Sequence, residues 1–560
     1  MASVSVTSSR NDSTTASLPA TADAEKAASV GENERRRLTG RAGIVAAGTL
    51  SSRVLGLVRD QVIAAMFARA ATDAFFVAFT IPNVLRQLLA EGAVQNAVLP
   101  VLESVRLREG DEEARRFFAA LRGLSLLILS LVTVVGIWAA PLIVDLFAAG
   151  YRSYPGQYER TVLLTRWLFP YIFWMGTAAL GVAALNVHRR FVVTSFAPAL
   201  LNVAFIASSL ILPAWLISER RDPVLALAVG ALVGGLLQVV AQWPSLAKIG
   251  YWIRPVFRFT NSALSEVLRR MGPVLFGVGI YYIDVVLARR FLSELGVGAQ
   301  SYFGWALRLC DFPQGIFVMA LQSATLPSLA LLVARNEMRE AAKTFAFSLR
   351  LTLFVALPAT VACVALSRPI TVLLFQRGQF DALSSAETAR ALVAQGAGIW
   401  MVAAVRQLVA MYYALGDTRT PVRVAAVDLC VFVLLALVLR GPLGHVGIGI
   451  AVTGSSFAQL CMLAIALRSR LPKLHLGEIM RTFFRTLIAA SGAAAVARVL
   501  VNVFGQSAAG GALSRATPGL IAVVSFVVIF LLLARLLRCD ELATIVQAIR
   551  RGRRGRASQG

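Results

Sequence analysis

Charge is scarce in this chain of 560 residues. Only 15% of its residues are charged and 57% are hydrophobic, whereas a typical soluble domain has roughly 25% charged residues. The mean hydropathy is +0.70. A soluble chain of this length would need several cores, each covered by a charged surface. The composition cannot supply that surface and also excludes disorder over most of the length, so it indicates a polytopic membrane protein.

Cysteines and catalytic motifs are also scarce. The five cysteines are scattered through apolar runs without a C-x-x-C pair, which excludes a disulfide scaffold and a zinc site. The sequence contains no P-loop, no H-E-x-x-H, no G-x-S-x-G and no aspartate-rich Mg²⁺ motif. We therefore expect a protein that is not an enzyme. Transport by this chain would draw on a gradient, on the membrane potential or on downstream consumption of the substrate.

Long apolar segments make up most of the sequence. A helix needs about 20 apolar residues to cross the hydrocarbon core of a bilayer. Fourteen segments satisfy this requirement, and they predict an all-α protein with fourteen transmembrane helices. The second segment is long for a straight crossing, so we expect it to tilt or bend. The segments are 42–66, 72–103, 123–148, 161–186, 192–217, 223–247, 268–292, 300–333, 345–375, 386–414, 422–439, 445–467, 483–504 and 517–537.

The basic residues predict the topology. The net charge is +25, and most Lys and Arg residues lie at the two ends and in loops that follow even-numbered spans. Loops rich in Lys and Arg face the cytoplasm, so we expect both termini to be cytoplasmic and no partner to be a nucleic acid. Residues 1–41 lack the apolar stretch of a signal peptide and predict a disordered tail. Residues 538–560 predict a basic tail that can lie against anionic lipid.

An internal repeat divides the chain. The sequence AVQNAVLP at 93–100, in the second span, resembles ALQSATLP at 320–327, in the eighth. This match predicts two six-helix lobes of the same orientation, which we name the N-lobe (42–247) and the C-lobe (268–467). Parallel repeats of this kind are a transporter architecture with the substrate site between the halves. The segment 483–537 lies outside the repeat.

Arginines inside the spans predict an anion site. Charges at the centre of a bilayer are costly and usually functional, and Arg binds phosphate through two oxygens at once. Five other arginines lie near span ends, where we expect them to extend to the membrane surface. The alternative for the internal arginines is pairing with Asp60, Asp73, Glu91 or Asp311. The predicted site arginines are Arg53, Arg59, Arg86 and Arg308; the peripheral ones are Arg289, Arg290, Arg350, Arg368 and Arg390.

Three further features qualify this site. Arg53 and Arg59 do not share a face of a straight helix, so we expect Gly56 to allow a bend or an unwound turn between them. Glu91-Gly92 predicts a break in the second span, where the carboxylate of Glu91 would brace an arginine or act as a gate. The alternative is a salt bridge that holds the second span to the first. Asp284 and Asp428 are single acids in the C-lobe that would hold a coupling cation or pair with Arg289 or Arg406.

The motifs resemble the MurJ/MviN family of lipid II flippases, which belongs to the MOP exporter superfamily. The resemblance covers roughly residues 43–537 and rests on six segments. One departure is Phe67-Ala68-Arg69-Ala70, where the family usually has a glycine-rich turn. The matching segments are SRVLGLVRD (52–60), TDAFFVAFTIPNVLR (72–86), AEGA (90–93), FPQG (312–315), LPSL (326–329) and GDTRTP (416–421).

The resemblance implies a function in peptidoglycan synthesis at the bacterial inner membrane. It implies flipping of lipid II, an undecaprenyl-pyrophosphate-linked disaccharide pentapeptide, by alternating access. Helices 13 and 14 would form a groove for the lipid tail. We expect no cofactor, with Na⁺ at Asp284 or the membrane potential as a coupling force. We expect a monomer, with association to the cell-wall synthesis machinery left open. The matched site residues are Arg53, Arg59, Arg86 and Arg308 for the substrate, with Asp60, Asp73, Asn83, Glu91 and Gly92 in supporting or gating positions.

Three alternatives stay open from the sequence. A flippase for another polyprenyl-linked saccharide would need nearly the same anion site. A MATE-like exporter would handle cations, and its cavity should carry acids instead of arginines. An enzyme acting on polyprenyl phosphates would need an acid–base pair, and we find none placed for that chemistry.

Overall fold

The computed structural model of the chain describes residues 43, 45, 47–87, 97–257, 262–471, 474–504 and 512–547. Over these residues the secondary structure is helical without a strand, which confirms the predicted all-α class. The elements are a first helix at 47–66, α2 (Arg69–Arg86), α3 (Leu99–Glu109), α4 (Asp111–Trp138), α5 (Ala140–Ala148), η2 (Ala149–Ser153), α6 (Gln157–Leu168), α7 (Pro170–Val187), α8 (Phe191–Ser218), α9 (Leu225–Lys248), α10 (Ser262–Ser293), α11 (Ala299–Pro313), η3 (Gln314–Val318), α12 (Met319–Ala334), α13 (Met338–Ala365), α14 (Ser367–Phe375), α15 (Ala382–Gly396), α16 (Ile399–Ala414), α17 (Arg419–Leu443), α18 (His445–Arg468), α19 (Leu476–Phe504), α20 (Ala512–Leu536) and a last helix at 540–547.

Ten helical segments among the described residues are long and apolar enough to cross a membrane. They correspond to the third to sixth and the ninth to fourteenth predicted spans, so the count of fourteen stays a prediction. The other four predicted spans, 42–66, 72–103, 268–292 and 300–333, are helical wherever the structure describes them. These four contain every residue predicted for the site, because the charges that build a site also lower the apolar character of its helices.

Several predicted spans are divided into shorter helices. The third span does not run without interruption over 123–148, because α4 ends at Trp138 and α5 begins at Ala140 with a proline in its first turn. Proline suits that position since its missing N–H would be unpaired there anyway. Helix α7 likewise begins at Pro170. The ninth span is divided at Leu366, between α13 and α14.

The second and eighth spans share an irregular feature. Residues 87 and 97–98 are π-helical in the second span, and the π-helix η3 separates α11 from α12 in the eighth. Both irregularities follow a proline, Pro82 or Pro313. A π-helical turn inserts an extra residue into a helix and frequently marks a functional site. Residues 88–96, which include Glu91, Gly92 and part of the first repeat copy, lie outside the described residues.

Small residues allow the helices of the N-lobe to pack closely. Helices α8 and α9 share one of the most extensive contacts in the molecule. At Gly234 of α9 an added Cβ would lie 2.8 Å from the Cα of Leu201 in α8, so only glycine permits this approach. Close backbone approach through small residues is the usual means of helix association in membranes.

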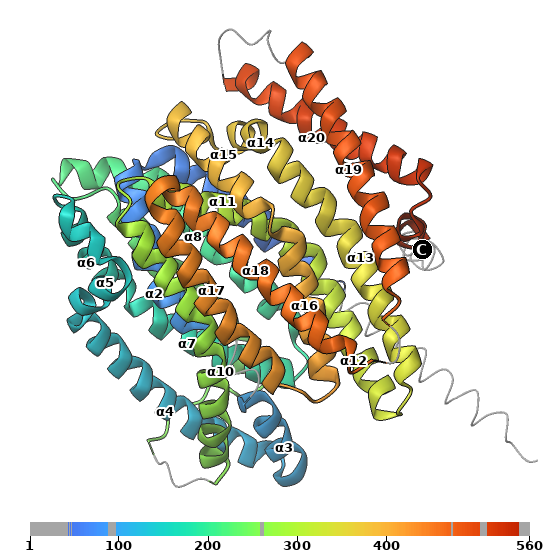
Figure 1. The fold of residues 1–560 in the computed structure, drawn as a ribbon. Coiled ribbons are helices and arrows are strands. Elements are labelled where there is room, and N and C mark those ends of the chain that lie inside the picture. Colours follow the sequence, from blue (N-terminus) through green and yellow to red (C-terminus); the bar gives the residue numbers. More distant parts are fainter. Residues whose placement is uncertain are drawn as a thin grey trace, which may run out of the picture.

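Helices α19 and α20 pack at the edge of the C-lobe. They lie along one edge of the molecule, opposite α4, α5 and α6 (Figure 1). Helix α19 contacts α13, and α20 contacts α14. The first part of the predicted C-terminal tail is the helix 540–547, in which Glu541 is only 3% exposed.

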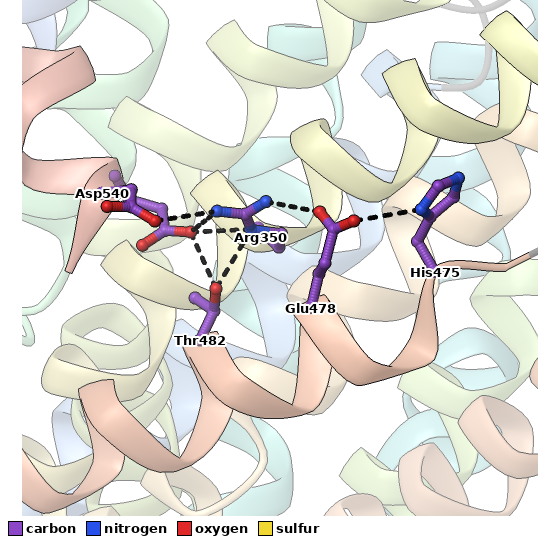
Figure 2. A network of polar contacts seen from close by, with 6 residues as sticks. Arg350, His475, Glu478, Thr482 and Asp540 are labelled. Carbon is purple, nitrogen blue, oxygen red and sulfur yellow. Dashed lines mark hydrogen bonds and ion pairs between the residues drawn. The ribbon is translucent and has the colours of Figure 1, made fainter.

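Arg350 of α13 holds this edge together. Its Nη2 lies 2.7 Å from Oε1 of Glu541 and its Nη1 donates to Oε2 of Glu478 at 2.8 Å (Figure 2). Thr482 of α19 donates to the same oxygen of Glu541 at 2.7 Å. Acids from two other segments therefore pair with Arg350, and its expected extension to the membrane surface stays a prediction.

Candidate functional site

The four predicted site arginines line one cavity of about 840 Å³. Arg53 and Arg59 come from the first helix, Arg86 from α2 and Arg308 from α11. Arg308 belongs to the C-lobe and the other three to the N-lobe, so the cavity lies between the lobes. Val45, near the beginning of the first helix, also lines it, which places the cavity toward the predicted cytoplasmic ends of the helices.

Arg59 is held in place by two partners. Its Nε and Nη2 donate to Oδ1 of Asp60 at 2.9 and 2.7 Å, and its Nη1 donates to Oδ1 of Asn202 at 3.0 Å. The other carboxylate oxygen of Asp60 lies 3.9 Å from Nε of Arg308. Asp60 therefore pairs with an arginine from each lobe, and an incoming anion would compete with this carboxylate for both guanidinium groups.

Arg53 lies against the π-helix. Its guanidinium occupies the space beside Gly315 of η3, where an added Cβ would overlap it. The Nε of Arg53 is buried and has no hydrogen-bond partner among the described residues. The first helix continues through Gly56 without an unwound turn. The unwound turn is therefore absent, whereas the bend at Gly56 stays a prediction. Both side chains line the cavity.

Arg86 is oriented by a neighbour on its own helix. Its Nε donates to Oδ1 of Asn83, one turn earlier in α2, at 3.1 Å. Both residues line the cavity. The proposed gating pair Glu91-Gly92 cannot be placed beside them, because it lies outside the described residues.

Asp73 does not pair with any of the four site arginines. Its side chain is fully buried in α2 and accepts hydrogen bonds from the backbone N–H groups of Gly298 (2.5 Å) and Ser301 (2.7 Å) and from the Ser301 hydroxyl (2.5 Å). These donors belong to the first turn of α11, where backbone N–H groups have no partner within the helix. Asp73 of the N-lobe therefore caps a helix of the C-lobe.

Aromatic packing continues this contact between the lobes. Phe76 of α2 meets Trp305 of α11 edge to face, with ring centroids 4.8 Å apart. Both side chains are nearly inaccessible to solvent. We name the contacts of α2 with α11 at Asp73, Phe76, Ser301 and Trp305 the inter-lobe seal. The seal lies at the predicted outer ends of the helices, opposite the end at which the cavity begins.

Arg69, where the sequence departs from the family pattern, belongs to the same end of the molecule. Its Nη1 donates to the hydroxyl of Tyr302 at 2.9 Å, and its Nη2 lies 3.6 Å from Oδ2 of Asp381. Both partners belong to the C-lobe. The arginine that replaces a glycine-rich turn therefore adds two contacts beside the inter-lobe seal.

The acids of the C-lobe form a pair of their own. Asp284 of α10 lies within electrostatic reach of Asp428 of α17. Each has a buried carboxylate oxygen without a hydrogen bond to the described residues. No ion pair in the described part of the chain joins them to Arg289 or Arg406. Arg289 is itself buried and donates to Gln300 at 2.8 Å, so the expectation that it extends to the membrane surface is wrong.

Sequence reasoning missed three buried amide side chains that line the cavity. Asn202 belongs to α8, and Gln238 and Gln242 belong to α9. All three are at most 5% exposed. The available signal was the pair of glutamines four residues apart in an otherwise apolar span, since buried amides in a membrane need a polar partner.

This architecture defines a class of membrane transporter in which two helical lobes enclose a cavity. Its fold matches solved transporters at low sequence identity. A lipid II flippase MurJ in an inward closed conformation superposes with a TM-score of 0.71 and 21% identity, covering 88% of this chain and 99% of that one. An inward-facing MATE family multidrug transporter of the MOP superfamily superposes at 0.63 and 15%, covering 75% and 94%.

Sequence comparison identifies the family. The family model described as lipid II flippase MurJ matches residues 62–514. The lipid II flippase MurJ of Burkholderia cenocepacia is 34% identical over 427 residues, covering 75% of this chain and 82% of the relative. A probable lipid II flippase MurJ of Vibrio cholerae is 33% identical, covering 75% and 81%. The chain belongs to the MurJ family, a family of multi-pass membrane transporters, which confirms the predicted resemblance.

Proposed function

We propose that this chain moves lipid II from the cytoplasmic to the outer leaflet of the bacterial inner membrane. The observation that carries the proposal is the cavity between the lobes, which is lined by Arg53, Arg59, Arg86 and Arg308. A pyrophosphate carries several anionic oxygens, and arginine forks bind such oxygens in pairs. The curated relatives named above as MurJ proteins support lipid II as the substrate.

We propose alternating access as the mechanism. The inter-lobe seal closes one end of the cavity, and the polar headgroup would enter from the other end while its lipid tail stays in the bilayer. Binding of the pyrophosphate would displace Asp60 from Arg59 and Arg308, and so weaken a contact between the lobes. Rocking of the lobes would then open the seal and close the cytoplasmic end. In this proposal both termini lie in the cytoplasm, as the loop charges predict.

The membrane potential is one proposed driving force. A potential that is negative inside opposes outward movement of an empty cationic site and assists outward movement of an anionic headgroup. It contributes about 2.3 kcal/mol per charge per 100 mV. Bound pyrophosphate lowers the charge of the moving site, so the loaded transporter reorients outward more easily. Flipping that is unchanged when the potential is collapsed would contradict this part of the proposal.

A sodium ion at Asp284 is a second proposed driving force. Two carboxylates without an arginine partner suit a hard cation, which prefers oxygen ligands. Asp284 and Asp428 would hold the ion and link α10 to α17. Replacing Asp284 with Asn should abolish a Na⁺ dependence of flipping if the ion binds there. A Na⁺ dependence that survives in Asp284→Asn would remove Asp284 from the proposal.

Complementation tests the substrate and the site together. The gene is placed in a bacterium depleted of its own lipid II flippase, and wild type is compared with Arg53→Ala, Arg59→Ala, Arg86→Ala and Arg308→Ala at equal membrane levels. We expect rescue by wild type and by the control Arg335→Ala, which changes an exposed arginine outside the cavity, and failure of the four variants. Rescue by all four would contradict the anion site, and failure of wild type would point to another polyprenyl-linked saccharide.

A further inference from the structure

The α9 wall of the cavity carries a second kind of polar surface. Gln238 and Gln242 lie one turn apart, so they share a face of the helix. Their exposed fractions are 4% and 2%, and both line the cavity that contains the arginines. The rest of α9 is mostly apolar. Two buried amides on one face therefore point to a local requirement for hydrogen bonding.

The protein leaves these amides almost without partners. Gln238 makes one weak contact, from Nε2 to the sulfur of Met175 at 3.5 Å, and sulfur is a poor acceptor. Gln242 has no hydrogen bond with any described residue. A buried amide without a hydrogen bond is unfavourable, so these groups need water or a ligand. Gly181 of α7 leaves space for the amide of Gln242, because an added Cβ there would overlap its Oε1.

Asn202 joins this wall to the arginines. It projects from α8, which packs along α9. Its Oδ1 accepts from Arg59, and its Nδ2 donates to the backbone oxygen of Ser52 at 2.9 Å. The amide wall and the arginine cluster are therefore adjacent regions of one cavity. Arginines only donate hydrogen bonds, whereas amides donate and accept, so the two regions suit different parts of one ligand.

We propose that Gln238 and Gln242 form a subsite for the uncharged part of the headgroup, the hydroxyl and amide groups of its sugars and peptide. The inference rests on the proposed function, in which the arginines bind the pyrophosphate. Hydroxyl and amide groups match side-chain amides because both partners donate and accept. The subsite discriminates a glycosylated polyprenyl pyrophosphate from the bare lipid pyrophosphate, which the arginines alone bind equally well.

The test uses the full-length purified protein and two probes. Lipid II carries the glycan and the peptide, and undecaprenyl pyrophosphate has the same anion and tail without them. Replacing both glutamines with methionine keeps the side-chain length and removes the amides. We expect Gln238→Met/Gln242→Met to bind lipid II about thirtyfold more weakly, since two lost hydrogen bonds contribute about 1 kcal/mol each and 1.4 kcal/mol is tenfold. Binding of undecaprenyl pyrophosphate should not change.

A matched control comes from the C-lobe. Gln407 of α16 is 1% exposed and accepts from Ser348 at 3.1 Å, outside the cavity. Gln407→Met should leave the ratio of the two affinities at the wild-type value. The thermal unfolding temperature shows whether each variant is folded. If the double variant does not accumulate, the binding measurement uses Gln242→Met alone. The single variant should weaken lipid II binding about fivefold, a smaller change in the same direction.

The outcomes separate the subsite from the anion site. Equal affinity of wild type and the double variant for lipid II overturns the subsite, as does an equal loss of affinity for both probes. Arg59→Ala should weaken binding of both probes. If Arg59→Ala binds both as wild type does, the proposed anion site fails instead, whatever the glutamine variants do.

Discussion

The two ends of the interface between the lobes differ in how their polar groups are paired. At the seal, Asp73 is fully buried and accepts three hydrogen bonds, and Phe76 packs on Trp305. In the cavity, Arg53 has a buried nitrogen without a described partner, and the side chain of Arg308 is 39% exposed.

This difference separates a protein contact from a binding site. The seal satisfies its own hydrogen bonds, so it is stable without a ligand. The cavity contains guanidinium and amide groups whose hydrogen bonds the described residues only partly satisfy. A ligand with anionic and neutral polar groups would supply the missing hydrogen-bond partners. Because α2 and α11 contribute to both regions, opening the seal must also rearrange the cavity.

The largest expected effect comes from breaking the seal at Asp73. Asp73→Ala leaves two backbone N–H groups and a hydroxyl in α11 without their acceptor, and each buried unpaired group costs about 1–3 kcal/mol. We expect the closed state to lose at least about 3 kcal/mol relative to the open state. A cysteine introduced at Thr72, which is 2% exposed and contacts Ser301 across the seal, leaves the three hydrogen bonds of Asp73 in place. Its accessibility to a membrane-impermeant thiol reagent measures the change.

The control for this prediction is a cysteine at the same position with Asp73 intact, in a background lacking reactive native cysteines. It should react slowly from the outside. Asp73→Asn, which keeps one acceptor oxygen, should react at an intermediate rate. Equal labelling of all three proteins would show that the seal does not depend on the carboxylate.

The second prediction concerns the counterion in the cavity. Asp60→Asn removes the carboxylate that pairs with Arg59 and lies near Arg308. An anion then meets less competition, so we expect inorganic pyrophosphate to bind about tenfold more tightly while complementation weakens, because the contact between the lobes is lost. Calorimetric titration measures the affinity. Weaker pyrophosphate binding would indicate that Asp60 orients the arginines instead of competing for them.

Much of this comparison follows from the sequence. The four intramembrane arginines and the repeat predicted a cavity between two lobes, because charges inside apolar helices need a polar surface to face. The role of Asp73 could not be predicted, since its donors lie 225 to 228 positions away and no local pattern indicates a helix capped by another lobe. The glutamines of α9 were overlooked because uncharged residues barely alter an apolar pattern.

A smaller effect is expected at Arg69. Its ion pair with Asp381 is partly exposed, at 36% and 50% for the two side chains, and such pairs contribute about 0–1 kcal/mol. Arg69→Ala removes the guanidinium and keeps a residue that favours the helix, so the protein should fold and complement. We expect slightly faster outside labelling of the Thr72→Cys reporter at low salt and no difference at high salt, where exposed charges are screened. A large effect at high salt would assign the contribution to the Tyr302 hydrogen bond.

The smallest effect is expected outside the interface, at Asp417 between α16 and α17. Its carboxylate accepts from the Thr420 hydroxyl at 2.6 Å and from the N–H groups of Arg419 and Thr420 at 3.0 Å. The hydrogen bonds from Thr420, with a smaller contribution from Arg470, lower the pKa of Asp417 below its ordinary value. A lowered folded-state pKa stabilises the protein at pH values above the unfolded pKa of about 3.9. This stabilisation disappears as the pH falls through the folded value. Asp417→Asn should therefore lose about 1 kcal/mol or less of folding stability at pH 7 and unfold at a slightly lower temperature than wild type. This difference in stability between the two proteins should decrease as the pH drops below 4. Because this loop touches neither the seal nor the cavity, pyrophosphate binding should be unchanged. A stability difference of the same size at pH 3 and pH 7 would show that the loop's stability does not depend on the charge.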